Sequence, residues 1–257
     1  MSERHPEGLH FVEEGRGEPL VLLHAFPLDG EMWDAEKKEL ARSHRVIVPD
    51  LRGFGKSESL EPRRSLDDHA DDVVRLLDRL KIERATLGGL SMGGYIALAL
   101  ARRYAARLSR LILADTRSLP DSADGKKGRN ESIALVASEG VAPLVERLLP
   151  KLLSANATDP VKERVRALAG RQSQAGVIAA LAAMRDRPDS GDVLPRIAIP
   201  TLVIVGEHDA ISPLAEARAI ASGIPKAQLA VIEGAGHLAN LESSARFLAA
   251  TRRFLDA

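Results

Sequence analysis

The sequence predicts an α/β fold with a mostly parallel central sheet. Short apolar segments of strand length alternate with longer amphipathic segments along much of the chain, a pattern typical of parallel strands covered by helices. Segment 19–24 is a continuous apolar run, as expected of a strand that is covered on both faces of the sheet. The length of 257 residues suits one such domain that carries an insertion.

The predicted elements follow one another regularly on both sides of one long interruption. The predicted strands are 19–24, 45–48, 85–89, 108–114, 201–205 and 228–232. The predicted helices are 65–80, 92–107 and 241–255. In the first of these helices, apolar residues recur every three or four positions and Ser65 precedes them as the expected N-cap.

Between Asp115 and Pro200 the alternation of strands and helices stops. The segments that look helical there are 133–153 and 161–184, and segment 126–130 is polar and expected to be mobile. A few helices alone bury little surface and must pack on something else, so we interpret this stretch as an insertion rather than an independent domain. The expected division is a core domain of residues 1–117 and 193–257 and a helical cap insertion of residues 118–192.

Composition excludes several classes of protein. Thirty-six basic residues balance thirty-six acidic ones, so the chain lacks the basic excess that binding to nucleic acid or an anionic membrane usually requires. The absence of cysteine excludes disulfides, thiolate zinc sites and a cysteine nucleophile. The first residues are polar, and no apolar run approaches the roughly 20 residues of a membrane span. We therefore expect a cytoplasmic protein with no membrane partner, metal or cofactor, either monomeric or homodimeric.

A candidate nucleophile lies in Gly89-Leu90-Ser91-Met92-Gly93, between a predicted strand and a predicted helix. An abrupt strand-to-helix turn strains the corner residue and exposes its side chain, and the positions two before and two after it must be small. The start of the helix also directs free N–H groups toward a developing oxyanion. A glycine-rich turn for close packing or phosphate binding is the alternative. We favour Ser91 as a nucleophile because suitable partners follow it.

Seven histidines compete to be the base that activates this serine. His237 lies in a glycine-containing loop directly after the last predicted strand. Loops after parallel strands share one edge of the sheet, which is also the edge of Ser91. We therefore predict His237 as the base. The others are less suitable: His5 and His10 in the N-terminal tail, His44 and His69 expected at the surface, His24 before the serine, and His208 beside an acid.

The third member of such a triad is an acid that orients the base. Asp209 follows the penultimate predicted strand at the same edge, and we predict it as this acid. Glu207 and Asp115 are its rivals, and Asp115 has two open interpretations, as the acid of a variant arrangement or as a cap for the insertion. The resulting chain order is Ser91, Asp209, His237.

These motifs together identify a family resemblance over essentially the whole chain. They are His24-Ala-Phe-Pro27, the run from Pro49 to Ser57, the serine turn, Gly206-Glu-His-Asp209 and Gly236-His237. The chain resembles the α/β-hydrolase superfamily, most of all its cap-bearing carboxylesterases, enol-lactonases and cofactor-free perhydrolases. This resemblance implies an α/β-hydrolase fold in which the backbone N–H groups of Phe26 and Met92 form an oxyanion hole. Each such donor can contribute about 10²–10³ in rate.

The chain departs from the family pattern in three places. Ala25 stands where relatives commonly have glycine, and Ser243-Ser244 where they often have proline. Little chain precedes Leu9, so we expect the sheet to be short at that edge. Asp50 and Arg52 resemble structural residues of the family rather than catalytic ones. We interpret Trp33 as a helix anchor in preference to a pocket residue.

The predicted chemistry is hydrolysis of a small carboxylic ester or lactone. A serine nucleophile makes an acyl-enzyme, and His237, stabilised by Asp209, then activates water. The insertion should cover the triad, and only eight aromatic residues occur in the chain, so we expect a compact aliphatic pocket. The alternatives are a perhydrolase or C–C bond hydrolase with the same triad, or a hydrolase-like signalling receptor with slow turnover.

Overall fold

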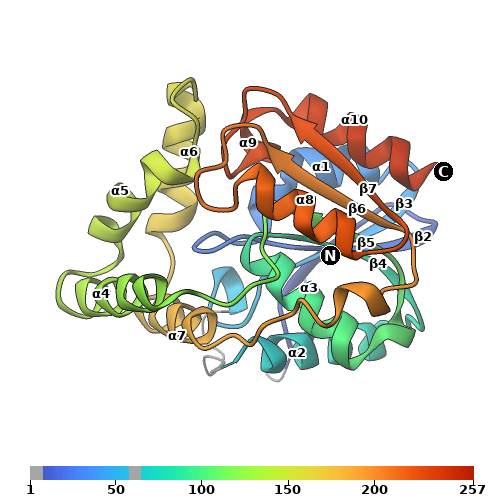
Figure 1. Ribbon diagram of the computed structural model, residues 1–257, viewed down its shortest axis with the longest axis horizontal. Helices are drawn as coiled ribbons and strands as arrows, with labels where there is room; N and C mark the ends of the chain where they lie inside the picture. The colour runs from blue at the N-terminus through green and yellow to red at the C-terminus, as the bar shows by residue number, and fades with distance from the viewer. Residues whose placement is uncertain (1–7, 58–64) are drawn as a thin grey trace.

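The computed structural model describes residues 8–57 and 65–257, which form a twisted, mostly parallel sheet flanked by helices (Figure 1). In these residues the sheet has seven strands in the order β1-β3-β2-β4-β5-β6-β7. The strands are β1 Phe11–Glu14, β2 Glu18–Leu23, β3 His44–Pro49, β4 Ala85–Leu90, β5 Leu108–Ala114, β6 Thr201–Gly206 and β7 Ala227–Ile232. Every neighbouring pair is parallel except β1 with β3. The predicted fold class is confirmed.

Strand β1 corrects one prediction. We expected the sheet to be short at this edge, but Phe11–Glu14 pairs antiparallel with β3, Phe11 opposite Pro49 and Glu14 opposite Val46. The strand begins after Leu9 rather than before it. It has only four residues, three half-buried and one exposed, so it lacks the apolar run by which the longer strands were recognised.

Helices cover both faces of the sheet. Those of the core are α1 Asp34–Leu40, α2 Leu66–Arg79, α3 Met92–Arg103, α8 Leu214–Gly223, α9 Ala239–Glu242 and α10 Ser244–Leu255. Short 3₁₀ turns are η1 Gly30–Trp33, η2 Gly55–Ser57, η3 Ala105–Arg107 and η4 Leu194–Arg196. Helices α1 and α10 pack together on one face, and α2 and α3 pack together on the other (Figure 1).

Two local predictions about these helices hold, and two others are wrong. Ser65 caps α2, its side chain accepting from the Asp68 N–H at 3.1 Å. Trp33 is buried and its ring lies 5.8 Å from that of Phe247 in α10, as an anchor does. His69 is buried because it lies on the inner face of α2. The single helix predicted at the C-terminus is divided into α9 and α10 at Ser243.

Four helices are inserted between β5 and β6 and stand beyond one end of the sheet (Figure 1). They are α4 Ala123–Glu139, α5 Val141–Leu152, α6 Asp159–Gly170 and α7 Gln174–Arg185. Helix α4 packs on α7, and α5 packs on α6. We call these four helices and their connections the insertion.

The insertion is more broken than its sequence predicted. Gly140, with φ of +84°, separates α4 from α5, and residues 171–173 separate α6 from α7. Each of the two predicted helices is therefore a pair. Segment 126–130, expected to be mobile, lies inside α4, which starts earlier because Ser122 caps it at the Gly125 N–H. Across the described ranges, no helix combines the length and apolar character needed to cross a bilayer.

Candidate active site

Ser91 occupies a strained corner between β4 and α3. Its backbone has φ of +53° and ψ of −111°, a combination that side-chain-bearing residues rarely adopt and that tends to occur at functional sites. The Ser91 N–H donates to the Ala114 carbonyl at 2.9 Å, and the Thr116 hydroxyl donates to the Ser91 carbonyl at 2.9 Å. Strand β5 and the residues after it therefore hold the corner in this conformation.

The two glycines around Ser91 are sterically required. A Cβ on Gly89 would lie 2.2 Å from the carbonyl oxygen of Gly93, and a Cβ on Gly93 would lie 2.4 Å from that of Leu23. Both are backbone contacts that no side-chain movement relieves. The predicted need for small residues at these positions is confirmed.

His237 and Asp209 come together in the loops after β7 and β6. His237 Nδ1 lies 2.9 Å from Asp209 Oδ2, and both side chains are buried. Asp209 Oδ1 accepts from the N–H groups of Ile211 and Ser212, at 2.8 and 2.9 Å. The Ser212 hydroxyl donates to Asp209 Oδ2 at 2.8 Å and lies 3.2 Å from His237 Nδ1.

These contacts determine the charge of Asp209 and the tautomer of His237. Burial by itself would raise the pKa of Asp209, but His237 and the hydrogen bonds from Ser212 lower it to about 2. Asp209 is therefore ionised near neutral pH and can only accept hydrogen bonds. It follows that His237 Nδ1 carries the donated proton, which leaves Nε2 as the basic nitrogen of the neutral ring.

The rival acids lie close by but do not contact His237. Asp115 follows β5 with φ of +43° and is buried, and its Oδ1 accepts from the Gly206 N–H at 2.7 Å. Burial, followed by the charge of Asp209, raises the pKa of Asp115 well above its ordinary value and so favours its protonated form. Glu207 lies at the surface, where it accepts from the Gly234 N–H at 2.9 Å.

The remaining described histidines have other surroundings. His24 is buried; its Nε2 accepts from the Leu51 N–H at 2.9 Å, and its Nδ1 faces the Ala25 carbonyl at 3.0 Å. Both of its ring nitrogens are thus occupied, and burial lowers its pKa. His208 is half-exposed beside Glu207. His44, expected at the surface, is buried where β3 begins, and His10, expected in a tail, is buried with Nδ1 2.9 Å from Asp50 Oδ2. His5 lies outside the described residues.

The two N–H groups expected to form an oxyanion hole are available as donors. Met92 is the first residue of α3, so its N–H has no acceptor within the helix. Phe26 follows β2, and in residues 8–57 and 65–257 its N–H has no hydrogen-bond acceptor. Strands β2 and β4 are neighbours in the sheet, with Leu23 opposite Gly89. Phe26 and Ser91 therefore follow adjacent strands at the same edge.

The Pro49–Ser57 turn is structural, as predicted. Asp50 Oδ1 accepts from the Gly30 N–H and Oδ2 from the Lys56 N–H, both at 2.9 Å. Arg52 forms a two-pronged ion pair with Asp72 of α2. These side chains fasten loops to one another and have no contact with the Asp209–His237 pair.

Two residues of this region escaped the sequence analysis. Ser212 binds both Asp209 and His237, and it directly follows Ile211, whose N–H two residues after the acid forms an Asx turn with Asp209. Glu242 accepts from the Gly236 N–H at 2.8 Å and from the Ser154 N–H of the insertion at 3.0 and 3.1 Å. No local pattern identifies Glu242, because Ser154 is 88 residues away in the sequence.

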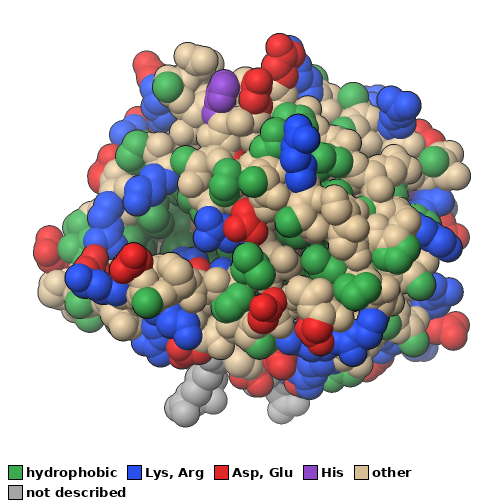
Figure 2. All heavy atoms as spheres, in the orientation of Figure 1, with side chains coloured by type: hydrophobic (Ala, Val, Ile, Leu, Met, Phe, Trp, Pro, Cys, Tyr) green, Lys and Arg blue, Asp and Glu red, His purple; other side chains and the backbone are tan. Residues whose placement is uncertain are grey.

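The insertion lies against the edge of the sheet that carries these residues. The Leu238 N–H, directly after His237, donates to the Leu152 carbonyl at the end of α5. The carboxyl ends of β6 and β7 point toward the insertion (Figure 1). Figure 2 shows the surface hollowed between the insertion and the core, with hydrophobic side chains inside the hollow.

A parallel sheet with a serine at its strand–helix corner, and a histidine–aspartate pair at the same edge, defines the class of α/β hydrolases. The chain belongs to this class: the Alpha/beta hydrolase family model matches residues 20–251.

Individual relatives include an esterase, an enol-lactonase and a semialdehyde hydrolase. A thermophilic esterase from Thermogutta terrifontis is 42% identical and superposes with a TM-score of 0.94, covering 99% of this chain and 96% of that one. The enol-lactonase from Burkholderia xenovorans LB400 is 29% identical with a TM-score of 0.90, covering 97% and 96%. The 2-hydroxymuconate semialdehyde hydrolase of Pseudomonas sp. strain CF600 is 35% identical, covering 95% of this chain and 88% of the relative.

Proposed function

We propose that this hydrolase cleaves small carboxylic esters or lactones, with Ser91 as nucleophile, His237 as base and Asp209 as the orienting acid. The observation that carries the proposal is the buried 2.9 Å contact between His237 Nδ1 and Asp209 Oδ2, at the sheet edge where Ser91 occupies its strained corner. The hydroxyl of a serine is a weak nucleophile until a neighbouring base removes its proton.

The reaction proceeds in two halves. Ser91 Oγ attacks the carbonyl carbon as its proton passes to His237 Nε2, and the resulting oxyanion accepts hydrogen bonds from the Phe26 and Met92 N–H groups. The tetrahedral intermediate then expels the alcohol, which takes the proton from His237. A water molecule attacks the acyl-enzyme in the same way and releases the acid. Asp209 stabilises the imidazolium formed in each half.

The relatives and the composition support the choice of substrate class. An esterase and an enol-lactonase both superpose over nearly the whole chain, and the chain has only eight aromatic residues to build a ligand platform. We take residues 118–192 as a cap that shapes the acyl and alcohol pockets, with 1–117 and 193–257 as the core. A C–C bond hydrolase with the same triad is the second candidate, favoured by the 35% identity to the semialdehyde hydrolase.

The test combines a serine probe with a substrate panel. A fluorophosphonate should label the wild type, and p-nitrophenyl acetate or butyrate and a small lactone should be turned over. The Ser91→Ala variant should lose labelling and at least roughly 10³-fold in kcat. Ser138→Ala removes an exposed serine hydroxyl on α4 and serves as the matched control, with activity unchanged.

Three outcomes would contradict the proposal. Wild-type turnover by Ser91→Ala would exclude this serine as the nucleophile. Turnover of a dienoic diketone without any ester or lactone hydrolysis would favour the C–C bond hydrolase, while tight ligand binding without multiple turnover would favour a receptor.

A further inference from the structure

The insertion is hydrogen-bonded to the loop that carries Phe26 through one buried carboxylate, that of Asp29. Asp29 lies three residues after Phe26 and is 1% exposed. Arg171 donates to it from both Nε and Nη2, to Oδ2 and Oδ1 respectively, each at 2.8 Å. The Gln172 side chain donates to Oδ2 at 2.7 Å. Three of the hydrogen bonds to this carboxylate thus come from the turn between α6 and α7.

The same carboxylate also organises its own loop. Asp29 Oδ1 accepts from the Glu31 N–H at 3.1 Å and so caps η1. The Asp29 carbonyl accepts from the Met32 N–H at 3.1 Å, and the Leu28 N–H donates to the Ala25 carbonyl at 2.9 Å. The path of the chain on both sides of Phe26 is therefore tied to the position of Asp29.

The α6–α7 turn holds a second core loop at the same time. Gln172 Oε1 accepts from the Gly55 N–H at 2.9 Å, and the Ser173 hydroxyl donates to the Gly53 carbonyl at 3.2 Å. The backbones of Gly53 and Gly176 approach so closely that a Cβ on Gly176 would lie 1.9 Å from the Gly53 oxygen. The α6–α7 turn is therefore packed closely against the Gly53–Gly55 loop of the core.

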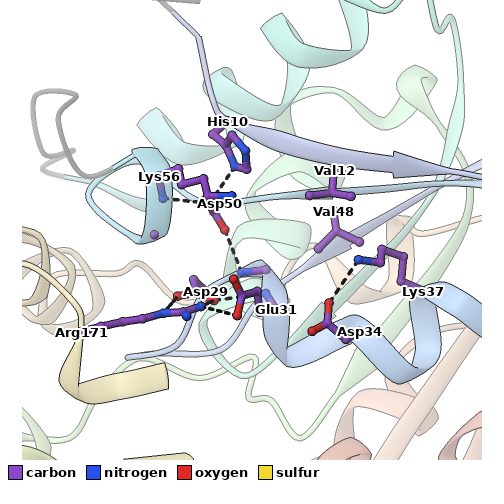
Figure 3. Close-up of a pocket in the computed structure, with 12 residues that line it drawn as sticks. His10, Val12, Asp29, Glu31, Asp34, Lys37, Val48, Asp50, Lys56 and Arg171 are labelled. Carbon is purple, nitrogen blue, oxygen red and sulfur yellow. Dashed lines mark hydrogen bonds and ion pairs between the residues drawn. The ribbon is translucent and has the colours of Figure 1, made fainter. Parts of the chain in front are cut away.

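Charge makes this contact specific. Burial by itself would raise the pKa of Asp29, but the hydrogen bonds from Arg171 and Gln172 hold it below its ordinary value. Arg171 also pairs with Glu31 Oε2 at 2.8 Å and stays part-exposed. Figure 3 shows Arg171 reaching across to Asp29 and Glu31 at the wall of a cavity of about 440 Å³. A buried carboxylate without its partners is strongly disfavoured. Asp29 therefore stabilises the arrangement in which Arg171 and Gln172 of the insertion contact it.

We propose that Arg171 and Gln172 are positioning residues that hold the Phe26 N–H in place for the oxyanion through Asp29. The role rests on the proposed function, because it concerns the oxyanion hole of that reaction. The role links the packing of the insertion on the core to the rate of the chemical step. If Arg171 and Gln172 lose contact with Asp29, the loop that carries the Phe26 N–H, one of the two oxyanion donors, is no longer held.

The experiment compares Arg171→Ala and Gln172→Leu with Arg166→Ala, an arginine of α6 whose ion pairs, with Glu146 and Glu163, stay within the insertion. Because losing one oxyanion donor costs about 10²–10³ in rate, partial displacement should lower kcat on p-nitrophenyl butyrate by about tenfold or more in the first two variants. KM should change less than about threefold. Arg171→Lys keeps the positive charge but cannot donate to both Asp29 oxygens in the same geometry. Its kcat should lie between those of wild type and Arg171→Ala.

A transition-state analogue separates positioning from general loosening. An alkyl trifluoromethyl ketone adds to the serine and places its alkoxide in the oxyanion hole, so its Ki should rise with the fall in kcat in Arg171→Ala and Gln172→Leu. Arg166→Ala should leave both unchanged.

The positioning role of Arg171 and Gln172 is refuted if kcat and the analogue Ki of both variants equal those of Arg166→Ala. It is also refuted if the two variants change KM alone and leave the analogue Ki unaltered. A wild type that neither turns over esters nor reacts with a fluorophosphonate overturns the proposed function, and this role with it. The two failures are distinguishable because the second is already seen in the wild type.

Discussion

Two buried aspartates at one edge of the sheet have pKa values shifted in opposite directions. Asp209 receives hydrogen bonds from two backbone N–H groups and the Ser212 hydroxyl and contacts His237. Asp115 accepts from the Gly206 N–H, but burial and then the charge of Asp209 raise its pKa. Burial penalises both carboxylates, and the neighbouring groups decide the direction: His237 and the hydrogen bonds from Ser212 lower the pKa of Asp209, whereas the negative charge of Asp209 adds to burial at Asp115.

This difference separates the two candidate acids by mutation. Asp115→Asn puts a neutral amide where burial already favours the protonated carboxyl; its oxygen can still accept from the Gly206 N–H and asparagine tolerates a positive φ, so Tm and kcat/KM should stay close to wild type. Asp209→Asn removes the charge that orients His237 and should cost up to roughly 10⁴ in kcat, the loss seen in serine-protease triads.

A third variant tests the structural role of Asp115 as the acceptor of the Gly206 N–H. Asp115→Ala leaves the Gly206 N–H buried without an acceptor, which costs about 1–3 kcal/mol, so Tm should fall. Steady-state kinetics and thermal unfolding measure both effects. A large loss of kcat in Asp115→Asn, with Asp209→Asn near wild type, would reverse the assignment of the acid.

At the scale of elements, α1 meets α9 and α10 through a buried acid. Glu36 of α1 is 1% exposed; its carboxyl accepts from the Ser244 hydroxyl at 2.6 Å and from the Asn240 amide at 3.5 Å. Burial raises the pKa of Glu36 to about 7. The three helices therefore close over a carboxyl that prefers to be protonated.

The stability of this junction should depend on pH. Well below the ordinary pKa of 4.5 the carboxyl is protonated in both states. As pH rises through 4.5 toward 7 only the unfolded chain loses its proton, so stability falls across this window and stays lower above it. Glu36→Gln cannot ionise, so its free energy of unfolding relative to wild type should increase by about 3 kcal/mol between pH 4 and pH 8. Urea unfolding of both proteins at the two pH values measures this, and a constant difference would refute it.

At the scale of the whole molecule, two of the contacts between the insertion and the core involve the loops of the candidate site. One is the Asp29 contact with the α6–α7 turn. The other is Glu242, which accepts from the N–H of Gly236, next to His237, and from that of Ser154, beyond α5. The loops of Phe26 and of His237 are thus held by the two connections that flank α6, residues 171–173 and 153–158.

Removal of the second of these contacts should affect stability and catalysis together. Glu242→Ala leaves two backbone N–H groups without their acceptor. At about 1–3 kcal/mol for each that stays dry, this should lower Tm by several degrees. The looser His237 loop should also reduce kcat, and Glu242→Gln, which keeps an acceptor oxygen, should recover part of both losses. Glu139→Ala, at the exposed end of α4, is the control, and equal effects in it and in Glu242→Ala would contradict this role of Glu242.

Sequence alone determined the features that depend on local physics. The parallel strands were predicted from short, mainly apolar segments that alternate with amphipathic ones. The Ser91 corner was predicted because a sharp strand-to-helix turn needs small residues on both sides. His237 and Asp209 were predicted because parallel topology brings the loops after all strands to one edge. Short β1 was missed because a strand of four residues, three half-buried and one exposed, carries little signal.

Only the tertiary structure decided which side chains meet across long separations. Asp115 and Asp209 both follow strands at the same edge, and the contact with His237 distinguishes them. Arg171 lies 142 residues from Asp29, and Glu242 lies 88 from Ser154. Such pairs leave no periodic trace in the sequence, because they depend on how the insertion packs against the core rather than on any element's own residues.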